Sequence, residues 1–354
     1  MAPHSQPFPL PENFPPTDTL FFPATANRAE DATTTVSTLV FFLPGNPGLV
    51  DYYTAFLSQL SALNPQLTVL GASHAGFSPD HPPVLHAGWA WKWGAPPWGL
   101  DAQVAMKKEL LLHAVAHVCP RRVVLVAHSM GAFLALELLS QLNHSQQQQQ
   151  QPPPQVEVAG GIMLFPTAME IAQSPQGQLM APFLASRAVR TIAWWASGAL
   201  SLLAALLSPL LPPSYRHSFL DVVVRLVTAQ TPHAATVTRR FACAPHAVEQ
   251  ALALAAEEMV AIAADRWADE VWNAGGSLPL PKEDGGGRGR GGMLFVFGQK
   301  DRWVAEETRQ AIMAKPRGGA RMIVEERGLP HNFCIHHGEE VAELCTDWLA
   351  DILG

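Results

Sequence analysis

Residues 122–132 read RVVLVAHSMGA, and this stretch decides the fold. Residues 122–127 form an apolar, β-branched run that predicts a buried parallel strand, and an apolar helical pattern begins at Ala132. A strand that turns sharply into a helix is the arrangement that exposes a serine nucleophile at the tip of the turn. Ser129 occupies that tip, with Ala127 where the motif usually has its first glycine. Ser129 is therefore the candidate nucleophile, although a serine at this point could also simply cap the helix.

Strands and helices alternate on both sides of this segment. Further apolar runs predict strands at residues 36–43, 67–72, 156–165, 293–297 and 322–324. Helical spacing predicts helices at residues 50–63, 102–118, 132–142 and 339–352. Such alternation favours the α/β class, with a mostly parallel central sheet covered by helices on both faces.

The chain divides into four predicted segments. Residues 1–34 form a proline-rich N-terminal arm, residues 35–165 and 293–354 form the two parts of an α/β core, and residues 166–292 form a largely helical cap between them. Seven prolines among the first 23 residues exclude a helix from the arm. We therefore expect an extended arm that is partly disordered or lies on the surface.

Two residues near the C-terminal end complete a candidate catalytic set. Asp301 ends the segment FGQKD after a predicted strand, and His331 lies in LPHNF after the next strand. Each could instead be structural, since Asp301 could be a turn residue or helix cap, and His331 is one of 14 histidines with His336 and His337 close by. The order Ser, Asp, His is nevertheless the one in which such a sheet carries a nucleophile, an orienting acid and a base. Because all three residues follow strand ends in this order, we expect Ser129, Asp301 and His331 to form a triad.

Acyl transfer also needs two backbone N–H groups that bind the developing oxyanion. One should belong to Met130, the residue after the nucleophile, and the other to the loop after the first core strand. That loop reads PGNPG, residues 44–48. Pro47 has no N–H and Gly45 is expected to make the turn, so Asn46 is the predicted second donor.

Charge and cysteine usage exclude several classes of protein. The chain has 23 basic and 30 acidic residues, a net charge of −7 and no basic run, which argues against nucleic-acid binding. The four cysteines are widely spaced without a CxxC pair, which suits a reducing compartment and does not support a metal site. The N-terminal sequence lacks the basic and apolar regions of a secretory signal. We therefore expect an intracellular protein with no metal and no other cofactor.

A long apolar stretch lies in the predicted cap. Residues 191–211 carry no formal charge, and as a helix they would span about 31 Å, enough for a bilayer core of about 30 Å. A single crossing would leave Ser129 on one side of the membrane and Asp301 and His331 on the other, so we expect no crossing. The stretch is then either a hydrophobic cap packed on the active site or an element in a lipid surface, which the paired Trp194 and Trp195 would suit.

Several fragments together resemble one family, the lipid droplet-associated hydrolases, a branch of the α/β-hydrolases. In order over roughly residues 36–350 they are FFLPGNPGLVDYY, VLGASHAGFS, Leu100 and Gln103 with Lys107, VAHSMGA, LFPTAMEIAQSPQGQLMAPFL, FGQKDRWV and LPHNFC. PGNPG and SPQG are more specific than the serine motif, which many hydrolases share. The chain departs from the family at Gln176, where Asn or Ser is frequent, in the polyglutamine spacer, and at Ala127.

The resemblance implies the α/β-hydrolase fold and a triad of Ser129, Asp301 and His331. It also implies an intracellular hydrolase of neutral lipid esters, such as sterol esters or acylglycerols, at the droplet monolayer or the cytosolic face of the endoplasmic reticulum. On that basis residues 191–211 are expected to lie in a lipid surface without crossing it. Two other interpretations remain open, namely a catalytically weak scaffold that binds droplets and a soluble hydrolase of small esters or thioesters.

Overall fold

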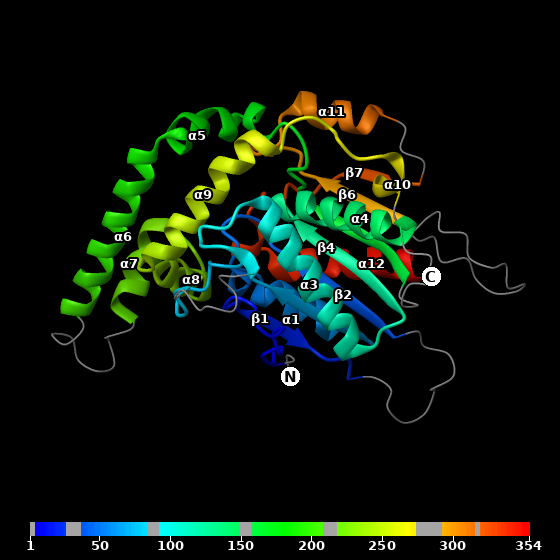
Figure 1. Ribbon diagram of the computed structural model, residues 1–354, viewed down its shortest axis with the longest axis horizontal. Coiled ribbons are helices and arrows are strands. Elements are labelled where there is room, and N and C mark those ends of the chain that lie inside the picture. Colours follow the sequence, from blue (N-terminus) through cyan, green and yellow to red (C-terminus); the bar gives the residue numbers. More distant parts are fainter. Residues whose placement is uncertain are drawn as a thin grey trace, which may run out of the picture.

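A seven-stranded sheet forms the centre of the protein (Figure 1). The computed structural model describes residues 4–25, 37–83, 92–148, 157–207, 218–273, 292–315 and 319–354. In the sheet order β1-β3-β2-β4-β5-β6-β7, all neighbours are parallel except β1, which runs antiparallel to β3. The strands are β1 (Thr19–Phe22), β2 (Thr38–Leu43), β3 (Leu67–Ala72), β4 (Arg122–His128), β5 (Glu157–Leu164), β6 (Gly292–Phe297) and β7 (Arg321–Val324).

Helices cover both faces of this sheet, which confirms the predicted α/β architecture. On one face α1 (Thr54–Leu63) packs against α12 (Gly338–Leu353), and on the other α3 (Leu100–Val118) packs against α4 (Met130–Gln148). Between these layers β2, β3 and β6 bury every residue, which explains their continuous apolar sequences. Shorter elements are η1 (Val50–Tyr53), which precedes α1, α11 (Glu306–Ala314) and η4 (Phe333–Ile335).

The described part of the N-terminal arm, residues 4–25, is extended and without a helix as expected, but it also pairs with the edge of the sheet, which was not expected. Residues 4–25 contain no helix, but β1 pairs with β3, and Gln6 forms a bridge with Phe21. Phe8, Phe14 and Phe22 are buried. The arm orders because these rings leave water when it lies along the sheet, and prolines exclude a helix but are tolerated beside an edge strand.

The described parts of the chain between β5 and β6 are mainly helical. Figure 1 shows α5, α6 and α7 arching away from the sheet, while α9 runs back toward it and packs against α5 and α6. The limits of this region as a separate cap, residues 166–292, stay a prediction. Its elements are η2 (Ile171–Gln173), α5 (Pro175–Ala185), α6 (Arg187–Leu207), α7 (Ser218–Thr228), α8 (Pro232–Ala242), α9 (Pro245–Ala261) and α10 (Asp269–Trp272).

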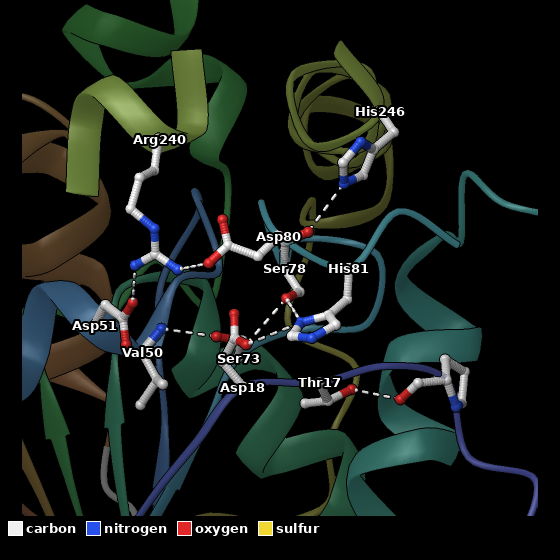
Figure 2. Close-up of polar contacts among 11 residues, drawn as sticks. Thr17, Asp18, Val50, Asp51, Ser73, Ser78, Asp80, His81, Arg240 and His246 are labelled. Atoms are coloured by element: carbon white, nitrogen blue, oxygen red, sulfur yellow. Dashed lines mark hydrogen bonds and ion pairs between the residues drawn. The ribbon is translucent and has the colours of Figure 1, made fainter. Parts of the chain in front are cut away.

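Polar contacts fasten α8 and α9 to the core (Figure 2). Arg240 of α8 donates to Asp51 Oδ2 at 2.8 Å and also binds Asp80. His246 of α9 donates from Nε2 to the carbonyl oxygen of Ser78 at 2.9 Å. Both helices are therefore held against the segments that follow β2 and β3.

α6 is a long apolar helix that remains exposed. Residues Arg187–Leu206 are long and apolar enough to cross a membrane by length and composition, yet almost none of them is buried. The helix covers the part of residues 191–211 that the structure describes, and residues 208–211 lie outside it. Most of α6 is therefore exposed, and the helix does not pack over a protein interior. Large apolar side chains exposed on α6 and α7 are Ile192, Trp194, Trp195, Leu200, Leu202, Leu203, Leu206, Val222, Val223, Leu226 and Val227.

Candidate active site

Ser129 lies in a tight turn between β4 and α4. Its φ of 54° is in the left-handed region, which a non-glycine residue adopts only where its surroundings hold it. Backbone hydrogen bonds hold this turn. The Ser129 N–H donates to the carbonyl of Leu164 at 3.0 Å, and the Ser129 carbonyl accepts from the Thr167 N–H at 3.2 Å. Gly131 must lack a side chain because a Cβ there would lie 2.3 Å from the carbonyl oxygen of Leu43. The strained turn that the serine motif requires is therefore present.

The three predicted triad side chains lie in one hydrogen-bonded series. His331 Nε2 lies 2.9 Å from Ser129 Oγ, and His331 Nδ1 lies 2.7 Å from Asp301 Oδ2. They meet because Ser129, Asp301 and His331 follow β4, β6 and β7, whose carboxyl ends share one edge of the parallel sheet. The side chains of His331 and Asp301 are 14% and 4% exposed. Such a series can move the Ser129 proton to His331 while Asp301 stabilises the imidazolium.

The segment that carries Asp301 also fixes its second oxygen. Asp301 Oδ1 accepts the backbone N–H of Trp303 at 2.8 Å, and the Trp303 ring lies 6.3 Å from the His331 ring. The structure places His331 rather than a neighbouring histidine beside the serine, and His337 contacts Glu340 instead. The carboxylate is thus oriented toward one imidazole.

The loop after β2 passes beside the nucleophile. A Cβ added to Gly45 would lie 2.9 Å from Ser129 Cβ. The Gly45 N–H is already used, because it donates to Tyr53 Oη at 3.1 Å. Within the described residues, the backbone N–H groups of Asn46 and Met130 have no protein acceptor. Both predicted donors are therefore available for an oxyanion, and that role stays a prediction.

The side chain of Asn46 is fixed by α9, a contact that sequence reasoning missed. Asn46 Nδ2 donates to the carbonyl of Ala251 at 3.1 Å and to Glu258 Oε1 at 2.7 Å. Burial raises the pKa of the Glu258 carboxyl to about 8, and the hydrogen bond from Asn46 partly opposes this shift. No local pattern indicates the pair, since the two residues are 212 positions apart and Glu258 lies in an ordinary helical sequence. The helical region therefore helps to set the geometry of the oxyanion loop.

Gln103 and Lys107, two of the residues that carry the family resemblance, bind the segment that follows β3. Gln103 and Lys107 hydrogen-bond the backbone of residues 72–75, with Lys107 Nζ 2.7 and 2.6 Å from two carbonyl oxygens. The buried His74 in that segment donates from Nε2 to the carbonyl of Pro44 at 3.0 Å. Burial, with the charge of Lys107, lowers the pKa of His74 well below its usual range, so His74 is neutral. These contacts hold the start of the PGNPG loop in place.

The other titratable side chains in the described part of the chain offer no candidate metal site. Among the described residues, no group of three or more His, Cys, Asp or Glu side chains could hold a metal ion. The four cysteines are free thiols. The chemistry that the triad geometry supports is acyl transfer through a serine ester.

Comparison with known sequences gives one family. The model of the lipid-droplet associated hydrolases matches residues 36–334, a range that includes all three triad residues. The lipid droplet-associated hydrolase of Gallus gallus is 29% identical over 319 residues, which cover 89% of this chain and 85% of that protein. The Mus musculus protein of the same name is 26% identical over 327 residues, covering 88% and 84%.

Comparison with solved structures shows the fold. The 2-hydroxy-6-oxo-6-phenylhexa-2,4-dienoate hydrolase from Rhodococcus sp. strain RHA1 aligns over 94% of both chains with a TM-score of 0.52 and 15% identity. The haloalkane dehalogenase DatA from Agrobacterium tumefaciens C58 aligns over 99% of this chain and 97% of its own with a TM-score of 0.51 and 13% identity. At such low identity the likeness concerns the fold alone, which is the α/β-hydrolase fold.

Proposed function

The chain belongs to the lipid-droplet associated hydrolase family, and from this premise we propose that it is a serine hydrolase of lipid esters that works at a lipid surface. The observation that carries the proposal is the series Ser129–His331–Asp301, with contacts of 2.9 and 2.7 Å. We propose that Ser129 is the nucleophile, His331 the base and Asp301 the acid.

The proposed reaction proceeds through an acyl-enzyme. His331 Nε2 takes the proton from Ser129 Oγ as that oxygen attacks the ester carbonyl. The tetrahedral oxyanion accepts hydrogen bonds from the backbone N–H groups of Met130 and Asn46. Collapse breaks the bond to the alcohol, which leaves with the proton held by His331. Water, deprotonated by His331, then attacks the Ser129 ester. Its collapse releases the fatty acid, and Ser129 Oγ takes back the proton from His331.

The exposed apolar surface of α6 and α7 supports a place at a lipid surface. Leu202 and Leu206 of α6 are each 61% exposed, and Leu226 and Val227 of α7 are 78% and 80% exposed. Apolar patches of this kind mark interaction sites, and an in-plane helix buries such a face at the boundary of headgroups and acyl chains. We propose the droplet monolayer and the cytosolic face of the endoplasmic reticulum as that surface, with sterol esters or acylglycerols as substrates.

The contacts of the triad argue that α6 does not cross a membrane. Ser129 precedes α6 in the chain, whereas Asp301 and His331 follow it, yet the three side chains are hydrogen-bonded. Both ends of α6 must then lie on the same side. Glycosylation or protease tags placed before α6 and after α7 should report one side, and tags on opposite sides would overturn both the topology and the triad.

The experiment that tests the function compares Ser129→Ala with the parent. A fluorophosphonate probe should label the parent and a control variant, Ser186→Ala, which changes a serine outside the site. It should not label Ser129→Ala, which loses only a hydroxyl and should remain folded. Lipidomics of droplets should show less sterol ester or acylglycerol with the parent than with Ser129→Ala.

Other outcomes would favour the competing functions. A parent that binds droplets but is not labelled would indicate a scaffold. A labelled parent that hydrolyses short soluble esters and does not bind droplets would indicate a soluble hydrolase. Full labelling of Ser129→Ala would remove Ser129 from the mechanism.

A further inference from the structure

A second series of hydrogen bonds lies beside the triad, and its side chains take no part in the proton transfer described above. The Gly45 N–H lies 3.1 Å from Tyr53 Oη, which lies 2.7 Å from His128 Nδ1. His128 Nε2 in turn lies 2.8 Å from the backbone carbonyl oxygen of His331. The four residues come from the loop after β2, from η1, from the end of β4 and from the loop after β7. The series therefore joins the oxyanion loop to the loop that carries the base.

The direction of each hydrogen bond follows from the two ends of the series. The carbonyl of His331 can only accept, so His128 Nε2 must carry a proton. In a neutral imidazole Nδ1 is then an acceptor, so the hydroxyl of Tyr53 donates to it. Tyr53 Oη keeps a lone pair that accepts the N–H of Gly45. All four groups are thus satisfied by one tautomer of His128 and one orientation of the Tyr53 hydroxyl.

The surroundings favour this neutral arrangement. Tyr53 and His128 are 3% and 4% exposed and lie among aromatic rings. Burial, with the nearby charge of His331, lowers the pKa of His128 well below its usual range, and burial raises the pKa of Tyr53 well above its own. The thiol of Cys334 also lies against the Tyr53 hydroxyl, but sulfur is a weak acceptor and does not compete with the imidazole.

We propose that Tyr53 and His128 are positioning residues for acyl transfer. Their hydrogen bonds fix the positions of the oxyanion loop and of the loop that carries His331 relative to Ser129. The inference rests on the proposed serine mechanism. His128 is suited to the task because it directly precedes Ser129, so its ring links the nucleophile turn to both other loops. Reacting groups tolerate little displacement, since a misplacement of about 1 Å can slow a reaction about 10²-fold.

The series has two arms, one from Gly45 through Tyr53 to His128 and one from His128 to the carbonyl of His331. Three substitutions separate them. Tyr53→Phe removes the hydroxyl and with it the bonds to Gly45 and His128. His128→Gln keeps an N–H donor at the place of Nε2 for the His331 carbonyl but offers Tyr53 no acceptor. His128→Asn keeps an oxygen at the place of Nδ1 for Tyr53 but has no donor that reaches His331.

The readouts are labelling by a fluorophosphonate probe, and kcat and KM for p-nitrophenyl butyrate, with circular dichroism as the check of folding. Tyr53→Phe should lower kcat and the labelling rate by about 10- to 100-fold and change KM little, because loop geometry serves the transition state. The matched control is Tyr52→Phe, which removes the adjacent buried hydroxyl, bound to Thr238 at 2.7 Å. The control should react at a rate close to that of the parent.

Double variants distinguish shared hydrogen bonds from damaged packing. Tyr53→Phe with His128→Gln breaks one arm twice, so the loss should not exceed that of the more severe single variant. Tyr53→Phe with His128→Asn breaks both arms, so the losses should multiply. His128→Asn should also shift the acidic limb of the pH profile of kcat/KM, because a loosened His331 changes its contact with Asp301, whereas His128→Gln should leave that limb in place.

The outcomes separate this inference from the mechanism on which it rests. If the parent is labelled, Ser129→Ala is not, and all Tyr53 and His128 variants react like the parent, the mechanism stands and the positioning role is refuted. Multiplicative losses in both double variants would refute it as well. An unlabelled parent would remove the mechanism and the inference together. If Tyr53→Phe does not fold, the pH profiles of the two His128 variants decide, and identical profiles would overturn the proposal.

Discussion

Two apolar helices of similar length have opposite surroundings in this protein. α4 has 19 residues and α6 has 21. In α4 the side chains of Phe133, Leu134 and Leu136 are at most 2% exposed, whereas in α6 Leu202 and Leu203 are 61% and 51% exposed. α4 packs against the sheet with α3 beside it, while α6 extends from the core and packs mainly against α9 (Figure 1).

The difference shows that apolar composition does not by itself place a helix in a protein interior. The apolar side chains of α4 leave water when the sheet folds, so their burial stabilises the protein without any partner. The same gain is not available to α6 within the chain. The proposed function gives the two regions separate tasks, with chemistry assigned to the core and lipid binding assigned to the outer helices α6 and α7. Each of the following changes tests that separation.

The largest expected effect lies in the core. Asp301→Asn should lower kcat for a soluble ester by about three to four orders of magnitude, because an amide favours the wrong tautomer of His331. Binding to artificial droplets, measured by flotation, should not change. The control is Asp347→Asn, at an exposed position on α12. A kcat equal to that of the parent would show that another acid orients the base.

The converse change lies in the outer helices. Replacing Leu202 and Leu206 by lysine should weaken droplet binding by about 10²-fold, since a lysine costs about 2.5–3.5 kcal/mol at the centre of a membrane helix and less at an interface. Hydrolysis of a soluble ester should continue. Leu112→Lys, on the 45% exposed Leu112 of α3, controls for added charge. If that control weakens flotation equally, α6 is not the lipid contact.

A smaller effect is expected where the two regions meet, at Glu258 of α9. Burial raises its pKa in the folded protein to about 8, above the ordinary value of 4.5, so between these pH values the folded protein holds a proton that the unfolded chain releases. Stability from this group is therefore lost as pH rises through that window, by a few kcal/mol at most. Glu258→Gln should gain stability over the parent as pH rises from 5 to 8. Thermal unfolding checks this, with exposed Glu270→Gln as control, and a constant difference would contradict it.

The parts of the fold that could be predicted are those with strong local patterns. The strand, turn and helix around Ser129 occupy adjacent residues, and buried parallel strands need continuous apolar runs, so their periodicity shows directly. The positions of Asp301 and His331 follow from the same rule, because the carboxyl ends of parallel strands share an edge. β1 was missed because the proline-rich N-terminal segment has no strand pattern. Its order comes from backbone pairing with β3 and from the burial of Phe8 and Phe14, both of which depend on distant residues.

Other features depend on contacts that no local pattern carries. Glu258 reaches Asn46 across 212 positions and Tyr53 reaches His128 across 75, so neither pair could be inferred before the chain was folded. The exposure of α6 could not be predicted either, since a buried helix and a lipid-facing helix have the same hydropathy. What separates them is visible only after folding: among the described residues α9 covers one side of α6, while large apolar side chains on its other side stay exposed.

The order of the segments also has a consequence for synthesis on the ribosome. Ser129 and α6 are translated well before Asp301 and His331, at about 5–20 residues per second. For seconds to tens of seconds the nascent chain therefore presents its apolar helix while Ser129 still lacks His331. Under the proposed mechanism a nascent chain can thus reach a lipid surface before it can attack an ester, and a product truncated after α7 would carry Ser129 without His331, its proposed base.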